Sequence, residues 1–525
     1  MKSFATLLDQ LFYQPQRNAK LRLLTAYFTS APDPDRGYAL AALTGDLSFQ
    51  HAKAGVLRNL AAERTDPVLF SLSYDYVGDL AETVALIWPG KGIVEAEPLS
   101  LATVVETLHA TPKSKLPNLL AEWLDRLDAV GRWALIKLIT GSLRIGVSSR
   151  LAKSALAGIG NLEASEVEEV WHALEPPYRE LFAWVEGKGP RPDARGHAAF
   201  RSPMLAHPLD PADLPKMDSA AFMAEWKWDG ARVQIVGEGA KVRLYSRSGD
   251  EMTATFPDVV DAASSDVTLD GELLVMRHGQ VGTFADLQKR LNRKTVSAEM
   301  LRESPVGVRL YDILFEEAED LRPLPFVVRR ARLEAWYAAK PRRGFDLSPL
   351  IPFKSWDELA DKQKAIAEVG VEGVMLKRAD SPYVAGRPTG QWYKWKTDPK
   401  LVDAVLMYAQ RGHGKRSSYY SDYTFGLWRG EELVPVGKAY FGFTDAELLE
   451  LDRWVRNHTV NHFGPVREVE RDVVLEVAFE GLQRSKRHRS GLAMRFPRIN
   501  RIRWDKPYRQ ADQLATLERL LPPEK

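Results

Sequence analysis

The chain has 525 residues, of which 45% are hydrophobic and 27% charged, so it holds enough apolar material for about three domains of roughly 150 residues. Its 72 lysines and arginines nearly balance its 70 aspartates and glutamates, which excludes nucleic-acid attraction through bulk charge and leaves local clustering as its source. The absence of cysteine excludes disulfides, thiolate metal sites and cysteine nucleophiles.

The first part of the chain, residues 1–200, is predicted to be entirely helical. Leucine, tryptophan and isoleucine return every three or four positions in stretches such as LPNLLAEWLDRLDAVGRWALIKLI, residues 116–139, which is the period of an amphipathic helix. The segment 186–215 is dense in proline, glycine and charge, which is typical of a linker. We therefore place a domain boundary near residue 200.

The middle part, residues 201–396, is predicted to mix strands and helices. Short alternating or apolar runs are separated by Gly, Asp and Ser, and this pattern favours strands. Such runs occupy residues 231–236, 241–247, 267–276 and 307–315. Helical spacing interleaves with them at 321–339 and 357–370. The pattern predicts an α+β domain.

The last part, residues 397–525, is predicted to be a small β-barrel. Strand-like runs occupy residues 403–410, 423–430, 432–440 and 472–482. One helix is expected around TDAELLELDRWVRNHTV, residues 444–460. No stretch of the chain approaches the ~18 apolar residues of a membrane span, so we expect a cytoplasmic protein with no membrane partner.

One lysine stands out in EWKWDGARV, residues 225–233. Side chains alternate along a strand, so Lys227 and Asp229 would point one way while Trp226 and Trp228 point into a core. Gly230 then lets the backbone turn. Taken alone, a solvated strand residue is the better interpretation of Lys227, because K-x-D-G is only four letters.

Further charged pairs follow in chain order. LDGELL places Asp270 and Glu272 on one face of a strand, and QWYKWK does the same for Lys394 and Lys396, although solvated strand faces would look alike. The five-residue gap in VEGVMLK would send Glu372 and Lys377 to opposite faces of a regular strand. We therefore expect a break in alternation near Gly373.

Together these segments supply acidic groups suited to Mg²⁺ and lysines that could surround a polyphosphate. A nucleotide site is the economical interpretation. A lysine amine attacks phosphorus only after it has lost its proton, which a metal ion and neighbouring cations favour. Lys227 is then the candidate nucleophile.

The ordered set K-W-D-G-x-R, S-R-S-G, D-G-E, L-Y-D, E-G-V-M-L-K and W-Y-K-W-K resembles the covalent nucleotidyltransferase superfamily, and specifically ATP-dependent DNA ligases. SGLAMRFPRINRIRWDK, residues 490–506, resembles the last motif of the ligase I type, and GSLRIGVSS, residues 141–149, resembles its helical DNA-binding domain. RGHGKRS, residues 411–417, resembles the opening of its C-terminal barrel. The resemblance covers roughly residues 100–510.

The resemblance implies three domains: an all-α DNA-binding domain at 1–200, an α+β nucleotidyltransferase (adenylation) domain at 201–396 and a C-terminal OB-fold β-barrel at 397–525. It implies ATP and Mg²⁺, with Mn²⁺ as an alternative, and nicked duplex DNA as the partner of a monomer. Lys227 would form a lysyl-AMP, from which AMP passes to the 5′-phosphate before the 3′-hydroxyl seals the strand. It implies a role in DNA repair, replication or recombination and leaves open which of these the protein serves.

The resemblance also assigns roles to individual residues. Glu225 would contact the adenine edge and Tyr311 would stack on the base. Arg232 and Arg247 would bind ribose and phosphate, Glu272 the ribose or a metal, and Glu372 the metal. Lys377, Lys394 and Lys396 would hold the α-phosphate or neutralise the transition state, Arg498, Arg501, Asp505 and Lys506 would close over ATP, and Arg144, Arg150 and Lys153 would hold DNA phosphates. Ser248 stands where many relatives carry Asn, which puts that contact in doubt.

Other interpretations are less favoured. An RNA ligase or an mRNA-capping guanylyltransferase would share the segments around Lys227 and Lys394, but the helical first part and residues 490–506 speak against them. A non-catalytic DNA-binding relative is disfavoured because every charged position that the chemistry needs is filled. RGHGKRS lacks P-loop spacing. His458 and His462, four apart on an expected helix, have no third metal ligand nearby and fit a helix surface.

Two features concern context. QLFYQPQ near the N-terminus lacks the aromatic pair expected of a sliding-clamp peptide. A short tail and the absence of a targeting segment suggest a prokaryotic host, with the protein at the nucleoid.

Overall fold

The computed structural model describes the chain apart from residues 91–98, 142, 264–265, 278, 292, 294, 340, 367–369, 413–418, 487 and 522–525. It divides into two compact units. The first contains Met1–Ile159, Pro176–Arg179 and Pro399–Lys525. The second contains Gly160–Glu175 and Glu180–Asp398.

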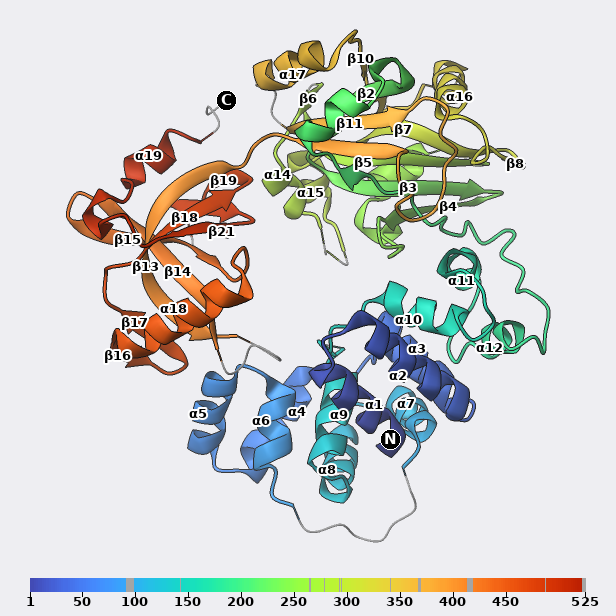
Figure 1. The fold of residues 1–525 in the computed structure, drawn as a ribbon. Helices are drawn as coiled ribbons and strands as arrows, with labels where there is room; N and C mark the ends of the chain where they lie inside the picture. The colour runs from blue at the N-terminus through green and yellow to red at the C-terminus, as the bar shows by residue number, and fades with distance from the viewer. Residues whose placement is uncertain are drawn as a thin grey trace. The chain divides into compact units, whose positions relative to one another are not determined.

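Among the described residues of the N-terminal region all regular secondary structure is helical, as its periodicity predicts (Figure 1, blue to cyan). Within the predicted stretch 116–139 the helix is interrupted once, because Asp128 accepts a hydrogen bond from the Gly131 amide at 2.7 Å and so starts a new helix. The helices are α1 (Lys2–Tyr13), α2 (Arg17–Ser30), α3 (Asp35–Thr44), α4 (Ala54–Arg64), α5 (Pro67–Val77), α6 (Leu80–Ile87), α7 (Leu101–Ala110), α8 (Leu116–Arg126), α9 (Ala129–Thr140), α10 (Ser149–Ala157), α11 (Ala164–Trp171) and α12 (Arg179–Val185).

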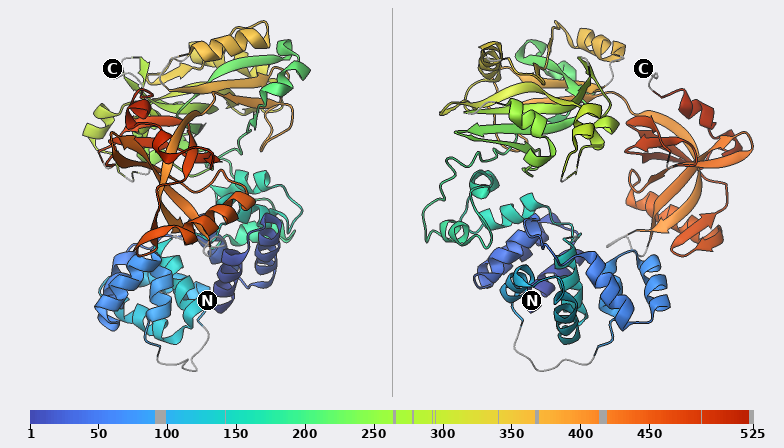
Figure 2. Two further views of the ribbon diagram at one scale, coloured as in Figure 1. Left: turned by 60° about the vertical axis from the view of Figure 1, so that its left-hand side comes forward. Right: turned by 180° about the vertical axis from the view of Figure 1, so that it is seen from behind.

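The C-terminal region is rich in strands, and Figure 2 shows it in orange to red from two further sides. Its strands are β13 (Lys400–Arg411), β14 (Tyr420–Arg429), β15 (Glu432–Ala439), β16 (Thr459–Phe463), β17 (Val466–Val469), β18 (Val474–Phe479), β19 (Gly481–Arg484), β20 (Leu492–Arg495) and β21 (Arg498–Arg503). Its helices are α18 (Asp445–Asn457) and α19 (Leu514–Glu518).

The long strand β13 makes the C-terminal sheet curl. Its first half pairs with β18, while its second half pairs with β17 on that side and with β14 on the other. Register shifts at Leu406/Tyr408 and Gln410/Arg411 mark the bulges that let the strand bend. The concave side holds a core of buried Val, Leu, Ile, Phe and Tyr side chains. A strand-rich region with a curled sheet is what the OB-fold prediction requires.

The second unit contains two sheets. One has the order β1 (His207–Pro208), β12 (Trp392–Lys396), β11 (Val371–Arg378), β2 (Phe222–Trp228) and β10 (Leu350–Ile351). The other has the order β4 (Lys241–Ser246), β3 (Ala231–Glu238), β5 (Val267–Arg277), β7 (Val306–Glu316) and β8 (Glu319–Asp320), with β6 (Gln280–Val281) on β5 and β9 (Phe345–Leu347) on β7. Besides α11 and most of α12, the helices of this unit are α13 (Pro257–Ala262), α14 (Phe284–Gln288), α15 (Ala298–Glu303), α16 (Phe326–Ala339) and α17 (Trp356–Ala365).

The two sheets have separate cores. The first packs on α17 through residues such as Val374, Leu376 and Leu359, and the second packs on α13, α14 and α16 through a larger apolar cluster. The strands expected at 231–236, 241–247, 267–276 and 307–315 all belong to the second sheet.

The expected linker at 186–215 is only partly one. Its first half has no regular helix or strand after Val185, as proline and glycine predict. From Ala198 onward, however, the chain is packed: Ala198 and Phe200 are buried against Val236 and Tyr245, and the Tyr245 hydroxyl donates to the Ala198 carbonyl at 2.7 Å. The apolar side chains of residues 198–200 anchor this segment on the second unit despite the surrounding prolines.

The predicted fold class is confirmed: an all-helical N-terminal region, an α+β middle part and a strand-rich C-terminal part with a curled sheet. The helix expected at 444–460 is α18, but it ends at Asn457 and His462 lies in β16. The helix-surface interpretation of His462 is therefore wrong. Among the residues that the structure describes, no helix is both long and apolar enough to cross a bilayer.

Candidate functional site

Lys227, near the end of β2, is paired with a carboxylate from β11. Its Nζ donates to Glu372 Oε1, and Lys396 Nζ on β12 lies 3.4 Å from the other oxygen, Glu372 Oε2. The Lys227 and Glu372 side chains are 21% and 23% exposed. A lysine held beside its counter-charge, yet still reachable from solvent, is unlike the freely solvated strand residue that was the alternative.

A bulge in β11 places Glu372 there. Pairing with β2 shifts register between Val371 and Val374, which confirms the break in alternation expected near Gly373. Gly373 has φ of 147°, and a Cβ at this position would lie 2.2 Å from the Trp395 carbonyl oxygen. Only glycine fits, and the bulge turns Glu372 toward Lys227.

One face of the first sheet therefore carries a row of charged side chains. Cross-strand partners share a face, and Met375 pairs with both Glu225 and Lys394, while Gly373 pairs with Lys396. The sequence-predicted residues on this face are Glu225, Lys227, Glu372, Lys377, Lys394 and Lys396.

Glu272 on β5 belongs to the same cluster. A Cβ on Gly230 would lie 2.8 Å from Glu272 Cγ, so the turn after Lys227 packs directly on this side chain. Burial raises the pKa of Glu272 to about 8, although the charges of Lys227 and Arg232 oppose the shift; Glu372 adds to it. Two carboxylates thus lie close enough to influence each other.

The cations of the site repel one another. Burial lowers the pKa of Lys394, and the charges of Lys396, Lys227, Arg387 and Arg247 lower it further. Burial likewise lowers the pKa of Arg247, the residue that follows β4. Arg247 lies close enough to Glu272 and Tyr311 for their charges to affect this pKa. Cations that disfavour one another in the free protein attract an anion such as a polyphosphate.

A buried network backs the cluster on the second sheet. Asp270, 1% exposed, accepts hydrogen bonds from Arg232 Nε at 3.0 Å, the Tyr311 hydroxyl at 3.1 Å and the Tyr383 hydroxyl at 2.7 Å. Tyr311 is the bulged residue of β7, unpaired between Leu310 and Asp312. Arg232 also donates to the Met204 carbonyl. These hydrogen bonds hold the Tyr311 ring and the Arg232 guanidinium in place.

Glu225 and Lys377 lie at the deep end of the charged row. Lys377, 1% exposed, is 2.6 Å from Glu225 Oε2 and 4.4 Å from the Tyr311 ring centroid. Arg330 on α16 donates to Glu225 Oε1 at 2.9 Å. Burial raises the pKa of Glu225, and Lys377 and Arg330 oppose the shift. Lys377 is therefore separated in depth from the Lys227 cluster, nearer to Tyr311.

Three residues of this site were not singled out from the sequence: Arg330, Tyr383 and Arg387. Arg330 could have been suspected, because FVVRRAR places charges within an amphipathic helix whose Arg329 and Arg330 are both buried. Ser248, flagged as a departure, donates within its own turn to Asp250.

The last motif lies in the first unit. Arg498 and Arg501 are on β21, where Arg501 pairs across the ladder with Glu476. Arg501 Nη2 is 3.9 Å from Asp505, which lies in the turn after the strand and is 61% exposed. Lys506 Nζ donates to Asp403 at 2.6 Å. Arg501 and Asp505 are exposed, whereas Arg498 and Lys506 are half-buried.

Family models match three segments of the chain. "DNA ligase N terminus" matches residues 1–157, "ATP dependent DNA ligase domain" 203–396 and "ATP dependent DNA ligase C terminal region" 416–506. A "Probable DNA ligase" of Koribacter versatilis (strain Ellin345) is 31% identical over 99% of this chain and 96% of that protein. The chain belongs to the ATP-dependent DNA ligases.

Other matches agree. A "DNA ligase" of Thermococcus onnurineus (strain NA1) is 30% identical over 84% of this ligase and 82% of its own length. The solved structure named "Pmar-Lig_PreS3" covers 95% of this chain and 99% of its own, with a TM-score of 0.58 at 18% identity, which shows the fold alone. The ligase is thus an enzyme that uses ATP to form phosphodiester bonds.

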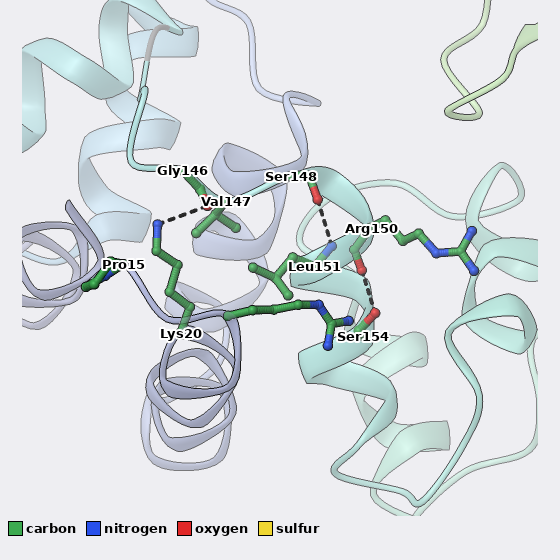
Figure 3. A pocket seen from close by; sticks show the side chains of 9 residues that line it. Pro15, Lys20, Gly146, Val147, Ser148, Arg150, Leu151 and Ser154 are labelled. Carbon is green, nitrogen blue, oxygen red and sulfur yellow. Dashed lines mark hydrogen bonds between the residues drawn. The ribbon is translucent and has the colours of Figure 1, made fainter. Parts of the chain in front are cut away.

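A basic pocket of about 550 Å³ opens in the helical region of the ligase, between α2 and the start of α10 (Figure 3). Its lining includes Arg17, Lys20, Ser148 and Arg150. Ser148 caps α10 by accepting the Leu151 amide, so the positive end of that helix faces the same space. Such a pocket suits an anion.

Lys20 shapes this pocket from inside. It is 7% exposed and donates to the carbonyls of Ile145 and Gly146, the second at 2.9 Å (Figure 3). Burial lowers its pKa. The turn that it holds contains Arg144 at φ 48° and Gly146 at φ 66°.

The three residues predicted to hold DNA differ in exposure. Arg144 and Arg150 are exposed, whereas Lys153 is 5% exposed within α10. The segment RGHGKRS lies mostly outside the described residues, since 413–418 are among the gaps.

Proposed function

We propose that this ligase seals nicks in duplex DNA through a covalent lysyl-AMP on Lys227 and a DNA-adenylate. The observation that supports this proposal best is the pairing of Lys227 with Glu372, beside Lys394, Lys396 and Glu272. A nucleophile, two carboxylates and several cations in one cluster suit in-line displacement at phosphorus, which needs positioning and charge neutralisation.

In the first step Lys227 Nζ attacks the α-phosphorus of ATP. The N–P bond forms as the bond to the bridging oxygen breaks, and pyrophosphate leaves with the electron pair. The amine gives up one proton to solvent before attack and another as the phosphoramidate forms. Glu372, which already accepts a hydrogen bond from Nζ, is placed to take the second proton.

The next two steps use DNA. An oxygen of the 5′-phosphate attacks the AMP phosphorus, the N–P bond breaks, and the released Lys227 nitrogen takes up two protons to become an ammonium again. The 3′-hydroxyl then attacks the 5′-phosphorus, releases AMP and gives the phosphodiester. Lys394 and Lys396 neutralise charge that gathers on the transferring phosphate.

The carboxylates fit Mg²⁺ or Mn²⁺ as an ion held jointly with phosphate. A carboxyl such as Glu272, with a pKa of about 8, is protonated at neutral pH unless positive charge is brought near. Among the described residues, no three acidic or histidine side chains form a metal cluster, so Glu272 and Glu372 would share the ion with phosphate and water. When bound, the ion would neutralise charge on the transferring phosphate.

We assign the adenine side to the deep end of the row. Glu225 would accept a hydrogen bond from the base edge while Lys377 and Arg330 hold it, and Tyr311 would stack on the base. Arg232 and Arg247 would contact ribose and phosphate. Arg498, Arg501, Asp505 and Lys506 would orient pyrophosphate in the first step.

We assign DNA phosphates to the basic pocket, with Arg150 and Arg17 as contacts. The exposed Arg144, in the turn that Lys20 holds, would be a further contact, and Lys153 would give internal support. Phosphate contacts carry no sequence information, which suits an enzyme that must act at any nick. Lys20 acts through the turn that it holds.

Lys20→Met is expected to weaken binding of nicked DNA about tenfold, because the Ile145 and Gly146 carbonyls lose their donor and the turn loosens. Formation of the AMP adduct from ATP should stay within twofold of wild type, since that step needs no DNA. Fluorescence anisotropy with a nicked duplex and a radiolabelled-ATP assay measure the two. Lys53→Met, an exposed lysine of the same region, is the matched control; unchanged DNA affinity in Lys20→Met would count against this role.

The proposed function is tested by the nucleotide that donates AMP and by the nicked nucleic acid that accepts it. With a divalent cation, ATP should label the chain with AMP, whereas GTP and NAD should not. The labelled ligase should then join nicked DNA far better than nicked RNA. Labelling by GTP would indicate a guanylyltransferase, and preference for RNA would indicate an RNA ligase.

A further inference from the structure

Two cations at the end of the last motif converge on one carboxylate. Asp403 Oδ2 lies 2.6 Å from Lys506 Nζ and 3.3 Å from Arg503 Nη1. The Asp403 side chain is 13% exposed, and those of Arg503 and Lys506 are each 21% exposed. Arg503 also pairs with Asp505 at 2.8 Å. The contact is therefore a partly buried network rather than a surface pair.

The backbone of Asp403 is held by strand pairing and by Asp512. It lies in β13 opposite Glu476 of β18. Its amide donates to Asp512 Oδ2 at 2.8 Å, and its carbonyl accepts the Asp512 amide at 2.8 Å. The residue that receives Lys506 thus has little freedom to follow a moving partner, and the orientation of Lys506 is set by Asp403 rather than the reverse.

The other carboxylate oxygen of Asp403 has an unusual environment. Oδ1 is buried and has no hydrogen-bond partner among the residues that the structure describes. Strand pairing alone does not require a carboxylate here. An apolar side chain would fill the position without the free-energy cost of a buried oxygen that has no hydrogen-bond partner. A charge kept under these conditions points to its use on the cations that it faces.

We propose that Asp403 is a positioning residue for the first chemical step, which orients Lys506 toward the pyrophosphate of ATP. An ammonium has three donors, so one hydrogen bond to Asp403 leaves two for phosphate oxygens. Without Asp403, Lys506 must be ordered from many rotamers each time ATP binds. This inference rests on the proposed role of Lys506. Asp403 itself lies outside the sequence motifs that carry the family resemblance.

The test separates the steps by substrate. The rate of AMP-adduct formation over a range of ATP concentrations reports the step that releases pyrophosphate, and single-turnover sealing of a pre-adenylated nick reports a step without it. Asp403→Asn should lower the first about tenfold at subsaturating ATP and leave the second within threefold. Asp422→Asn removes a similarly buried partner of Lys438 in the same region and should change neither.

A double variant checks that Asp403 acts through Lys506. Lys506→Ala should slow adduct formation, and adding Asp403→Asn to it should cause no further loss. Should Asp403→Asn fail to fold by circular dichroism, Asp403→Glu, which keeps the charge on a longer arm, should give a smaller loss confined to the first step.

Three results would overturn the inference: an unchanged first step, a faster one, or equal losses in both steps. A faster first step would mean that Asp403 restrains Lys506 instead of presenting it. If the wild type itself formed no AMP adduct, the proposed function would fail, and this outcome is distinct from any behaviour of the variants.

Discussion

Lys227→Ala is expected to lower formation of the AMP adduct at least about a thousandfold, because no other amine replaces the attacking group. Wild type and variant are incubated with radiolabelled ATP and a divalent cation, and covalent label is followed by gel. The variant should still bind DNA, since the basic pocket of the helical region is untouched.

Lys227→Arg separates the nucleophile from the charge. Arginine keeps the positive partner of Glu372 but stays protonated, so it cannot attack phosphorus. It should form no adduct while preserving thermal stability. Substantial labelling of either variant would show that another residue carries the AMP.

Glu372→Gln is expected to slow adduct formation on the order of a hundredfold. Glutamine is neutral, so it neither holds Lys227 and Lys396 as their counter-charge nor helps to bind a divalent cation. Initial rates at saturating ATP, measured over a range of Mg²⁺ and then Mn²⁺ concentrations, should show both the lower maximum and a higher metal requirement.

Glu316→Gln is the matched control for this effect. Glu316 pairs with Arg332 at 2.7 Å and is 27% exposed, close to the exposure of Glu372, but it lies at the end of β7 and not in the cluster. It should leave the rate and the metal dependence unchanged. A Glu372→Gln enzyme with the wild-type metal dependence would contradict the assignment of that carboxylate.

The charged row could be predicted from the sequence because side chains alternate between the two faces of a strand. Lys394 and Lys396 are two residues apart and share a face because the local period is two. The bulge at Gly373 was also foreseeable, since a five-residue gap brings Glu372 and Lys377 to one face only if alternation breaks. The bulge is present. The alternation of side chains along a strand was therefore enough to predict the part of the site around Lys227 and Glu372.

Long-range partners were not readable in this way. Arg330 reaches Glu225 across 105 residues, and Lys506 reaches Asp403 across 103. No spacing rule links such positions, because tertiary packing alone brings them together. The same limit explains the segment near Ala198, whose composition predicted a linker while its apolar side chains pack on the second unit.

The most direct test of the central claim is peptide mapping of the wild-type ligase after incubation with ATP and Mg²⁺. Mass spectrometry should find one AMP on the peptide that contains Lys227, and this mass should disappear when pyrophosphate or a nicked duplex is added. An AMP mapped to any other residue, or an intact chain that gains no mass, would contradict the account.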